Sequence, residues 1–137
     1  MPCTRHLVEV RHHWTEFERR DARVLAISFS PPSEVAAHAG RLKLPYELAA
    51  DPQRSTYTSY GVERGTTWQA WHPKALWKYI KAWARGEKIQ RNKKGDDLLQ
   101  LGADFVIGKD RIVRLAYYSQ RSDDRPSVDL LLAGLDQ

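Results

Sequence analysis

One cysteine stands near the start of this 137-residue chain, and its neighbours are residue types that can activate a thiol. Cys3 is followed by Thr4 and Arg5, at the start of a predicted helix. A cysteine reacts as the thiolate, and a helix N-terminus with a nearby cation lowers the thiol pKa below its ordinary value of about 8.5. Such a thiolate attacks a peroxide or a disulfide, and a peroxide converts it to a sulfenic acid. Because the chain has no second cysteine, the resolving thiol must come from a small molecule or a partner protein.

A second interpretation of Cys3 is purely structural. The residue lies close to a chain end, where residues are often poorly ordered and hold no substrate pocket. In that case Cys3 is a vestige of an active site. The composition and the spacing leave both interpretations open.

The histidines of the same predicted helix offer another kind of site. His6 and His13 are seven residues apart and fit one helix face, and Glu9 is the only obvious third ligand nearby. Histidines that face solvent explain this pattern more simply. We therefore expect neither a metal nor another cofactor.

A basic segment rich in tryptophan occupies residues 64–98, and we refer to it as the insertion. The formal net charge is +5, yet eight basic residues and one acid lie between Lys74 and Lys94, so that stretch carries +7 and the remainder −2. The interpretations that remain open are a helix that covers the sheet or a dimer contact, a nucleic-acid surface, a surface for an anionic membrane or an acidic partner, and a lid beside Cys3. Nucleic acid is not the partner that we expect, because the rest of the chain is slightly acidic.

The length and composition indicate one globular domain spanning residues 1–137. A single cysteine excludes an internal disulfide framework. No apolar run approaches the ~20 residues needed to span a bilayer, and the first residues lack the apolar core of a signal peptide. We expect a cytoplasmic protein that is not associated with a membrane.

Hydrophobic periodicity and turn residues predict alternating helices and strands. In chain order the predicted elements are a helix from Thr4 to about Arg20, a buried strand at Arg23–Ser30, a helix from Glu34 to about Arg41, an extended stretch at Leu44–Ala49, a short helix at Gln53–Tyr60 ended by Gly61, two strands at Asp104–Ile107 and Arg111–Tyr117 joined by a turn at 108–110, and a final helix that begins near Pro126. In the second helix, Val35, Ala36, Ala39 and Leu42 are predicted to face inward. This order implies a mixed sheet with helices on both faces.

Several sequence blocks occur together in a definite order: PCTRHL around Cys3, VLAISFSPP at 24–32, LPYELAADP at 44–52, YTSYGVERG at 57–65 and GDDLLQLGADFVIGKDRIV at 95–113. In this order and spacing the chain resembles the alkyl hydroperoxide reductase/thiol-specific antioxidant (peroxiredoxin-like) superfamily. The resemblance implies a thioredoxin-like α/β fold, a three-layer sandwich with a central mixed sheet, here lacking the usual N-terminal strand. It also implies an apparently truncated start, or a strand supplied by another chain and hence a homodimer.

The resemblance places Cys3 where the family has its active-site thiol, with Thr4 and Arg5 supporting the thiolate. Members of the superfamily also carry an arginine near the strand that begins here at Asp104, where this sequence has Gly102 and Ala103. The implied function is a thiol-dependent oxidoreductase or peroxidase. Its substrate is a peroxide or disulfide, and an external thiol reductant completes a one-cysteine cycle. The alternative is a non-catalytic binding or assembly module that uses the insertion to bind an acidic partner or nucleic acid.

Overall fold

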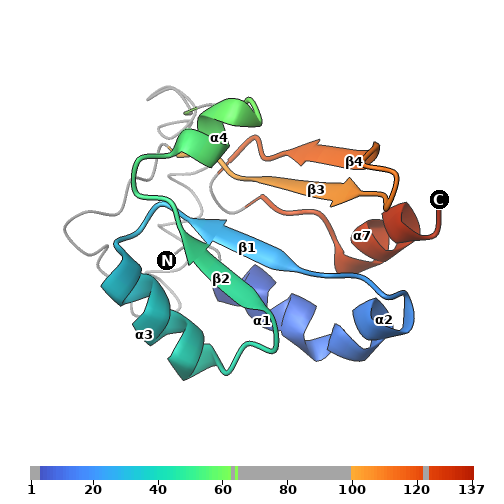
Figure 1. Cartoon of the computed structure of the whole chain (residues 1–137), viewed down its shortest axis with the longest axis horizontal. Coiled ribbons are helices and arrows are strands. Elements are labelled where there is room, and N and C mark those ends of the chain that lie inside the picture. Colours follow the sequence, from blue (N-terminus) through green and yellow to red (C-terminus); the bar gives the residue numbers. More distant parts are fainter. Residues whose placement is uncertain (1–3, 63, 65–99, 122–123) are drawn as a thin grey trace, which may run out of the picture.

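The computed structural model describes residues 4–62, 64, 100–121 and 124–137 (Figure 1). The described elements, in chain order, are α1 (Thr4–His12), α2 (Trp14–Arg19), β1 (Leu25–Ser28), α3 (Pro32–Leu42), β2 (Glu47–Ala50), α4 (Ser55–Ser59), β3 (Ala103–Ile107), β4 (Val113–Tyr118) and α7 (Val128–Leu135). None of the helices in these parts of the chain combines the length and apolarity that crossing a bilayer requires. Cys3 and nearly all of the insertion lie outside the described residues.

The strands confirm a mixed α/β fold. β1 and β2 pair in parallel, with Leu25 opposite Glu47, whereas β3 and β4 pair antiparallel, with Ala103 opposite Tyr118. Among the described strands these are two separate two-stranded ladders, and the helices lie around them (Figure 1). Arg64, at the edge of the insertion, forms an isolated antiparallel bridge with Gln100.

The predicted first helix is interrupted at His13, so the prediction of one continuous helix was wrong. His13 has φ −100° and ψ 15°, outside the helical range. Its ring Nδ1 lies 2.9 Å from the carbonyl oxygen of Glu9, the acceptor that its own backbone N–H uses in a regular helix. That N–H is shared between two acceptors, the Glu9 oxygen at 3.3 Å and the Val10 oxygen at 3.1 Å. A side chain competing for the helical acceptor separates α1 from α2.

α4 ends as the sequence predicts, through Gly61. This glycine has φ 67°, and its N–H donates to Thr58 while the N–H of Val62 donates to Tyr57. These two hydrogen bonds form a Schellman motif, which favours glycine at the left-handed position. At the other end of α4, the Asp51 carboxylate accepts hydrogen bonds from the backbone N–H groups of Ser55 and Thr56, and so satisfies donors that a helix leaves free.

Most predicted boundaries shift by one to three residues, and for two of them the structure shows the cause. α7 begins after Pro126, at Val128, because the Ser127 side chain accepts a hydrogen bond from the N–H of Leu130 and caps the helix. The turn between β3 and β4 extends to Arg111, which adopts a left-handed φ of 66°.

In α3 the prediction of an inward face was partly wrong. Val35 is buried and Ala39 and Leu42 are partly buried, but Ala36 is exposed. His38 takes the remaining buried place on this face.

The main core joins helices from both ends of the chain to β3. Its buried members are Val10 of α1, Phe17 of α2, Val106 of β3 and, from α7, Val128, Leu131 and Leu132. Tyr46 packs at its margin, and its hydroxyl donates to the carbonyl oxygen of Leu7 over 2.6 Å. Burial raises the pKa of Tyr46 to about 12. These contacts hold α1 against the strands and so position the residues at its start.

Candidate functional site

The site predicted from the sequence lies at the start of α1, and the structure describes part of it. Thr4 is the first residue of α1 and Arg5 is exposed to solvent. Cys3 lies outside the described residues, although one peptide bond joins it to Thr4. Of the three predicted site residues, the structure therefore describes Thr4 and Arg5.

A chain of polar contacts reaches Thr4 from α3. Nε2 of the buried His38 lies 3.1 Å from the Thr4 hydroxyl, and Nδ1 of the same ring lies 3.1 Å from the guanidinium of Arg41. A guanidinium only donates hydrogen bonds, so Nδ1 must be the acceptor. A neutral His38 therefore carries its proton on Nε2 and donates it toward Thr4. This arrangement fixes the tautomer of His38.

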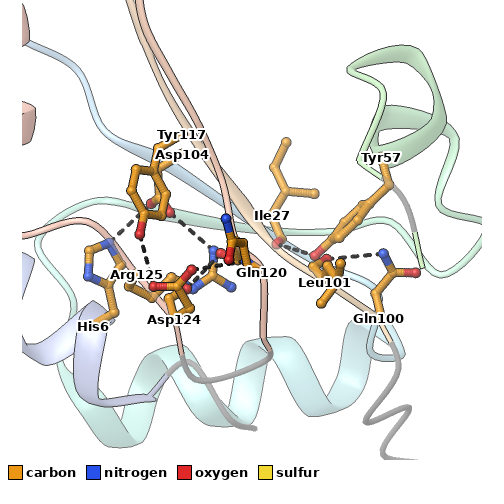
Figure 2. A network of polar contacts seen from close by, with 11 residues as sticks. His6, Ile27, Tyr57, Gln100, Leu101, Asp104, Tyr117, Gln120, Asp124 and Arg125 are labelled. Atoms are coloured by element: carbon orange, nitrogen blue, oxygen red, sulfur yellow. Dashed lines mark hydrogen bonds and ion pairs between the residues drawn. The ribbon is translucent and has the colours of Figure 1, made fainter. Parts of the chain in front are cut away.

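Two residues further along α1, His6 meets a carboxylate on strand β3. Nε2 of His6 lies 3.1 Å from Oδ1 of Asp104, and Nη1 of Arg125 lies 3.2 Å from Oδ2 of the same carboxylate (Figure 2). The three side chains are 11%, 17% and 18% exposed, respectively. The structure thus brings together a histidine, an aspartate and an arginine from three separate parts of the chain.

Asp104 is held in its ionised form. Burial by itself raises the pKa of a carboxyl group. In Asp104 this effect is outweighed by the hydrogen bond with His6 and by the charges of Arg125 and His6, which together hold the pKa of Asp104 below its ordinary value. The group at the centre of this cluster is therefore a carboxylate at neutral pH.

Arg125 brings a guanidinium to the start of β3, where Gly102 and Ala103 provide no charge. A Cβ atom at Gly102 would collide with the guanidinium of Arg125, so the glycine leaves room for this side chain beside the start of β3. The positive charge near this strand comes from a later loop and not from positions 102 and 103. Asp104 and Arg125 are 21 residues apart in the sequence, so no local pattern indicated that they pair.

The loop that carries Arg125 is organised by the preceding residue. Asp124 accepts hydrogen bonds from the Tyr117 hydroxyl and from the backbone N–H of Gln120, each over 2.9 Å, and its carbonyl oxygen accepts one from the Ser119 hydroxyl over 2.6 Å (Figure 2). The hydrogen bond to Asp124 raises the pKa of Tyr117. The loop after β4 is thereby tied back to the strand, which sets the position from which Arg125 extends.

The sequence of the chain is similar to one known protein family. The sequence profile of the AhpC/TSA antioxidant enzymes matches residues 10–121, which is most of the chain. The protein belongs to the AhpC/TSA antioxidant enzyme family. Among curated proteins, no match to the chain is found.

The fold of this AhpC/TSA family member is thioredoxin-like, as the resemblance implied. The matched residues contain Asp104, while the predicted nucleophile Cys3, together with Thr4 and Arg5, precedes them and Arg125 follows them. The roles of Cys3, Thr4 and Arg5 therefore remain predictions.

Sequence reasoning missed His38, Asp104 and Arg125 as members of the site. One signal was present: Asp104 is a charged residue within an otherwise apolar strand, a position that requires a partner when it is buried. No sequence pattern near Asp104 indicated which residues would be its partners.

Within the parts of the AhpC/TSA protein that the structure describes, no three His, Cys, Asp or Glu side chains gather into a metal site.

Proposed function

We propose that the protein is a thiol-dependent peroxidase or oxidoreductase of the peroxiredoxin-like type, with Cys3 as its nucleophile. The observation that carries the proposal is the AhpC/TSA family match over residues 10–121. It is supported by the position of Cys3 in the chain, directly before the first residue of a nine-residue helix. The N-terminus of a helix stabilises a thiolate through its free N–H groups and its dipole.

The proposed cycle uses one cysteine. The Cys3 thiolate attacks one oxygen of the peroxide, the S–O bond forms as the O–O bond breaks, and the leaving oxygen takes up a proton to become an alcohol or water. Sulfur loses two electrons and becomes a sulfenic acid. One external thiol converts this acid to a mixed disulfide with release of water, and a second thiol regenerates Cys3 and leaves as part of a disulfide.

Two described groups support this assignment through charge and hydrogen bonding. Arg5 places a cation in the first turn of α1, and Thr4 is held by His38 at the first position of the helix. Thr4 and Arg5 act as supports of the thiolate in the proposal, and Cys3 alone reacts.

The experiment follows Cys3 with two reagents in the full chain. We expect iodoacetamide to alkylate the folded protein with a pH midpoint clearly below ~8, and the midpoint to return to ~8.5 on unfolding. We expect the wild type to consume hydrogen peroxide with dithiothreitol as the external thiol, and Cys3→Ser to lose this activity while keeping its fold. Equal midpoints in folded and unfolded protein, together with no peroxide consumption, would contradict the proposal.

A further inference from the structure

We propose that the outer edge of β4 is an interface between two copies of this chain, whose β4 strands pair antiparallel with Ala116 of each copy opposite Tyr118 of the other. The inference goes beyond the proposed function and uses no property of Cys3. In Figure 1, β4 is the outermost strand of its ladder, and β3 lies between it and β1. A strand in such a position offers unpaired backbone groups to another chain.

The hydrogen bonds of the ladder determine which backbone groups of β4 point outward. The N–H of Ser119 donates to the carbonyl oxygen of Gly102, and the antiparallel register continues from there along both strands. Successive residues of such a strand bond alternately toward one neighbour and toward the other. The N–H and C=O groups of Ala116 and Tyr118 therefore point away from β3. No residue in the described part of the chain donates to these carbonyl groups or accepts from these N–H groups.

This edge is also the most accessible among the described strands. Ala116 and Tyr118 are both exposed. In β1 the carbonyl oxygen of Ile27 already accepts a hydrogen bond from the Tyr57 hydroxyl over 3.1 Å. β2 and β3 each expose only one terminal residue. A further strand therefore meets the fewest obstacles at β4.

Natural sheets protect exposed edges, and β4 has such protection at one end only. A bulge interrupts the register beside Val106 and Ile107, and at the same end of β4 Arg114 binds Asp110 over 2.6 Å. Bulges and charged side chains both hinder pairing with another strand. Residues 115–118 contain neither a charged residue nor a proline. This stretch is therefore the part of the edge that is open to pairing.

Apolar side chains flank the open edge. The register and the alternation along each strand place Tyr118 on the same face of the ladder as Phe105, Ile107 and Val113. The ring of Tyr118 packs edge-on against Phe105, with 5.5 Å between the ring centroids. Ile107, Val113 and Tyr118 are nevertheless 44%, 49% and 50% exposed. An exposed apolar surface beside an unpaired strand edge is typical of a protein interface.

The open stretch is complementary to itself, which makes a second copy the partner. In an antiparallel pair centred on Tyr117, the outward groups of Ala116 meet those of Tyr118 of the second copy, and the twofold axis repeats this pairing. Every outward N–H and C=O group of the stretch then has a partner. The small side chain of Ala116 leaves room for the neighbouring tyrosine ring. Arg114 lies opposite Gln120, so that no like charges face each other across the pair.

The test measures the mass of the full chain by sedimentation equilibrium over a range of concentrations, with dithiothreitol present so that Cys3 forms no disulfide. We expect the 15.8 kDa monomer to associate reversibly to twice that mass. Ala116→Arg places a charge on the outward edge and should raise the dissociation constant about tenfold or more. Ala36→Arg is the matched control, because Ala36 is also exposed but belongs to α3, which packs against β2 and lies apart from β4 (Figure 1).

Two outcomes of this experiment would overturn the proposal. One is a wild type that stays monomeric at every concentration, which would leave the edge to a different protein or to solvent. The other is an A116R variant that associates as tightly as A36R. Association that A116R weakens and A36R retains would support the interface.

A measurement on the wild type alone keeps the inference testable if A116R does not fold. Amide hydrogen exchange followed by NMR reports each backbone N–H separately. We expect the N–H groups of Ala116 and Tyr118 to exchange slowly in the dimer and faster on dilution, whereas those of Leu115 and Tyr117 stay protected by β3 at every concentration. Fast exchange of Ala116 and Tyr118 in a dimeric sample would show that the copies meet elsewhere, and the proposal would be wrong.

Discussion

At the scale of single residues, Asp104 is the group on which the described polar cluster depends. It accepts hydrogen bonds from His6 and from Arg125, and its side chain is only 17% exposed. A carboxylate in such a position is stable only because both partners are present. Removing its charge therefore affects three side chains at once.

We expect Asp104→Asn to lower the free energy of unfolding at pH 7 by about 2 to 3 kcal/mol. Breaking a fully buried ion pair costs about 3 to 5 kcal/mol, and the loss here is at or below the lower end of that range because the site is partly exposed. Denaturant unfolding monitored by tryptophan fluorescence measures this loss. Glu18→Gln, a matched change at an exposed position, should cost less than about 0.5 kcal/mol. Equal losses in the two variants would show that the cluster contributes no stability.

The same substitution gives a pH dependence with a definite sign. The folded protein holds the pKa of Asp104 below its ordinary value, so its contribution is fully present above the pKa of the unfolded chain, ~3.9, and is lost as the pH falls through the folded pKa. The difference in stability between wild type and D104N should therefore shrink below pH ~4. A difference that stays constant down to pH 2 would contradict this assignment.

At the scale of elements, the end of α4 depends on one backbone conformation. Gly61 has φ 67°, and the nearest atom that a Cβ there would meet is the Tyr118 hydroxyl oxygen at 3.9 Å. A substitution therefore meets no steric clash, and its cost comes from the left-handed backbone alone. The stop signal of this helix is local, which is why the sequence predicts it.

We expect Gly61→Ala to lower the free energy of unfolding by about 1 kcal/mol, because a left-handed φ is unfavourable for a residue with a Cβ. Gly61→Asn should cost less, since asparagine tolerates this region better. Thermal unfolding of the two variants measures the difference. Equal stability of alanine and glycine at this position would mean that the turn relaxes to another conformation.

At the scale of the whole molecule, one core unites the two ends of the chain. Phe17 of α2 is 4% exposed and belongs to the cluster that includes Val106 of β3 and Leu131 of α7. This packing fixes α1 and α2 relative to β3. It therefore also sets the distance between His6 and Asp104.

We expect Phe17→Ala to lower the free energy of unfolding by about 3 to 5 kcal/mol, because burial is lost and a cavity remains. This loss is a large part of the typical free energy of unfolding of a protein, about 5 to 15 kcal/mol. Leu25→Ala is the control, because Leu25 is 56% exposed, and it should cost less than about 1 kcal/mol. Calorimetry reports both values. A small loss in F17A would indicate that the two halves of the chain do not share a core.

The elements themselves were largely predictable from the sequence. Apolar periodicity located the helices, the apolar run after Arg23 located β1, and Gly61 marked the end of α4. These signals are local, since hydrogen bonds within a helix and turn conformations involve residues a few positions apart. The errors were also instructive. The break at His13 came from a ring that competes for a helical acceptor, and a hydropathy pattern does not contain such an effect.

The sequence by itself determined the alternation of helices and strands, the mixed α/β class, the family resemblance and the single thiol at Cys3. Only the tertiary structure decided which polar side chains meet. His6 and Asp104 are 98 residues apart, and His38 reaches Thr4 across 34 residues. No local pattern encodes such pairs, because they form only when α1 packs against β3 and α3 in the folded core. For that reason the sequence identified a candidate nucleophile, and the fold identified the cluster of His6, Asp104 and Arg125.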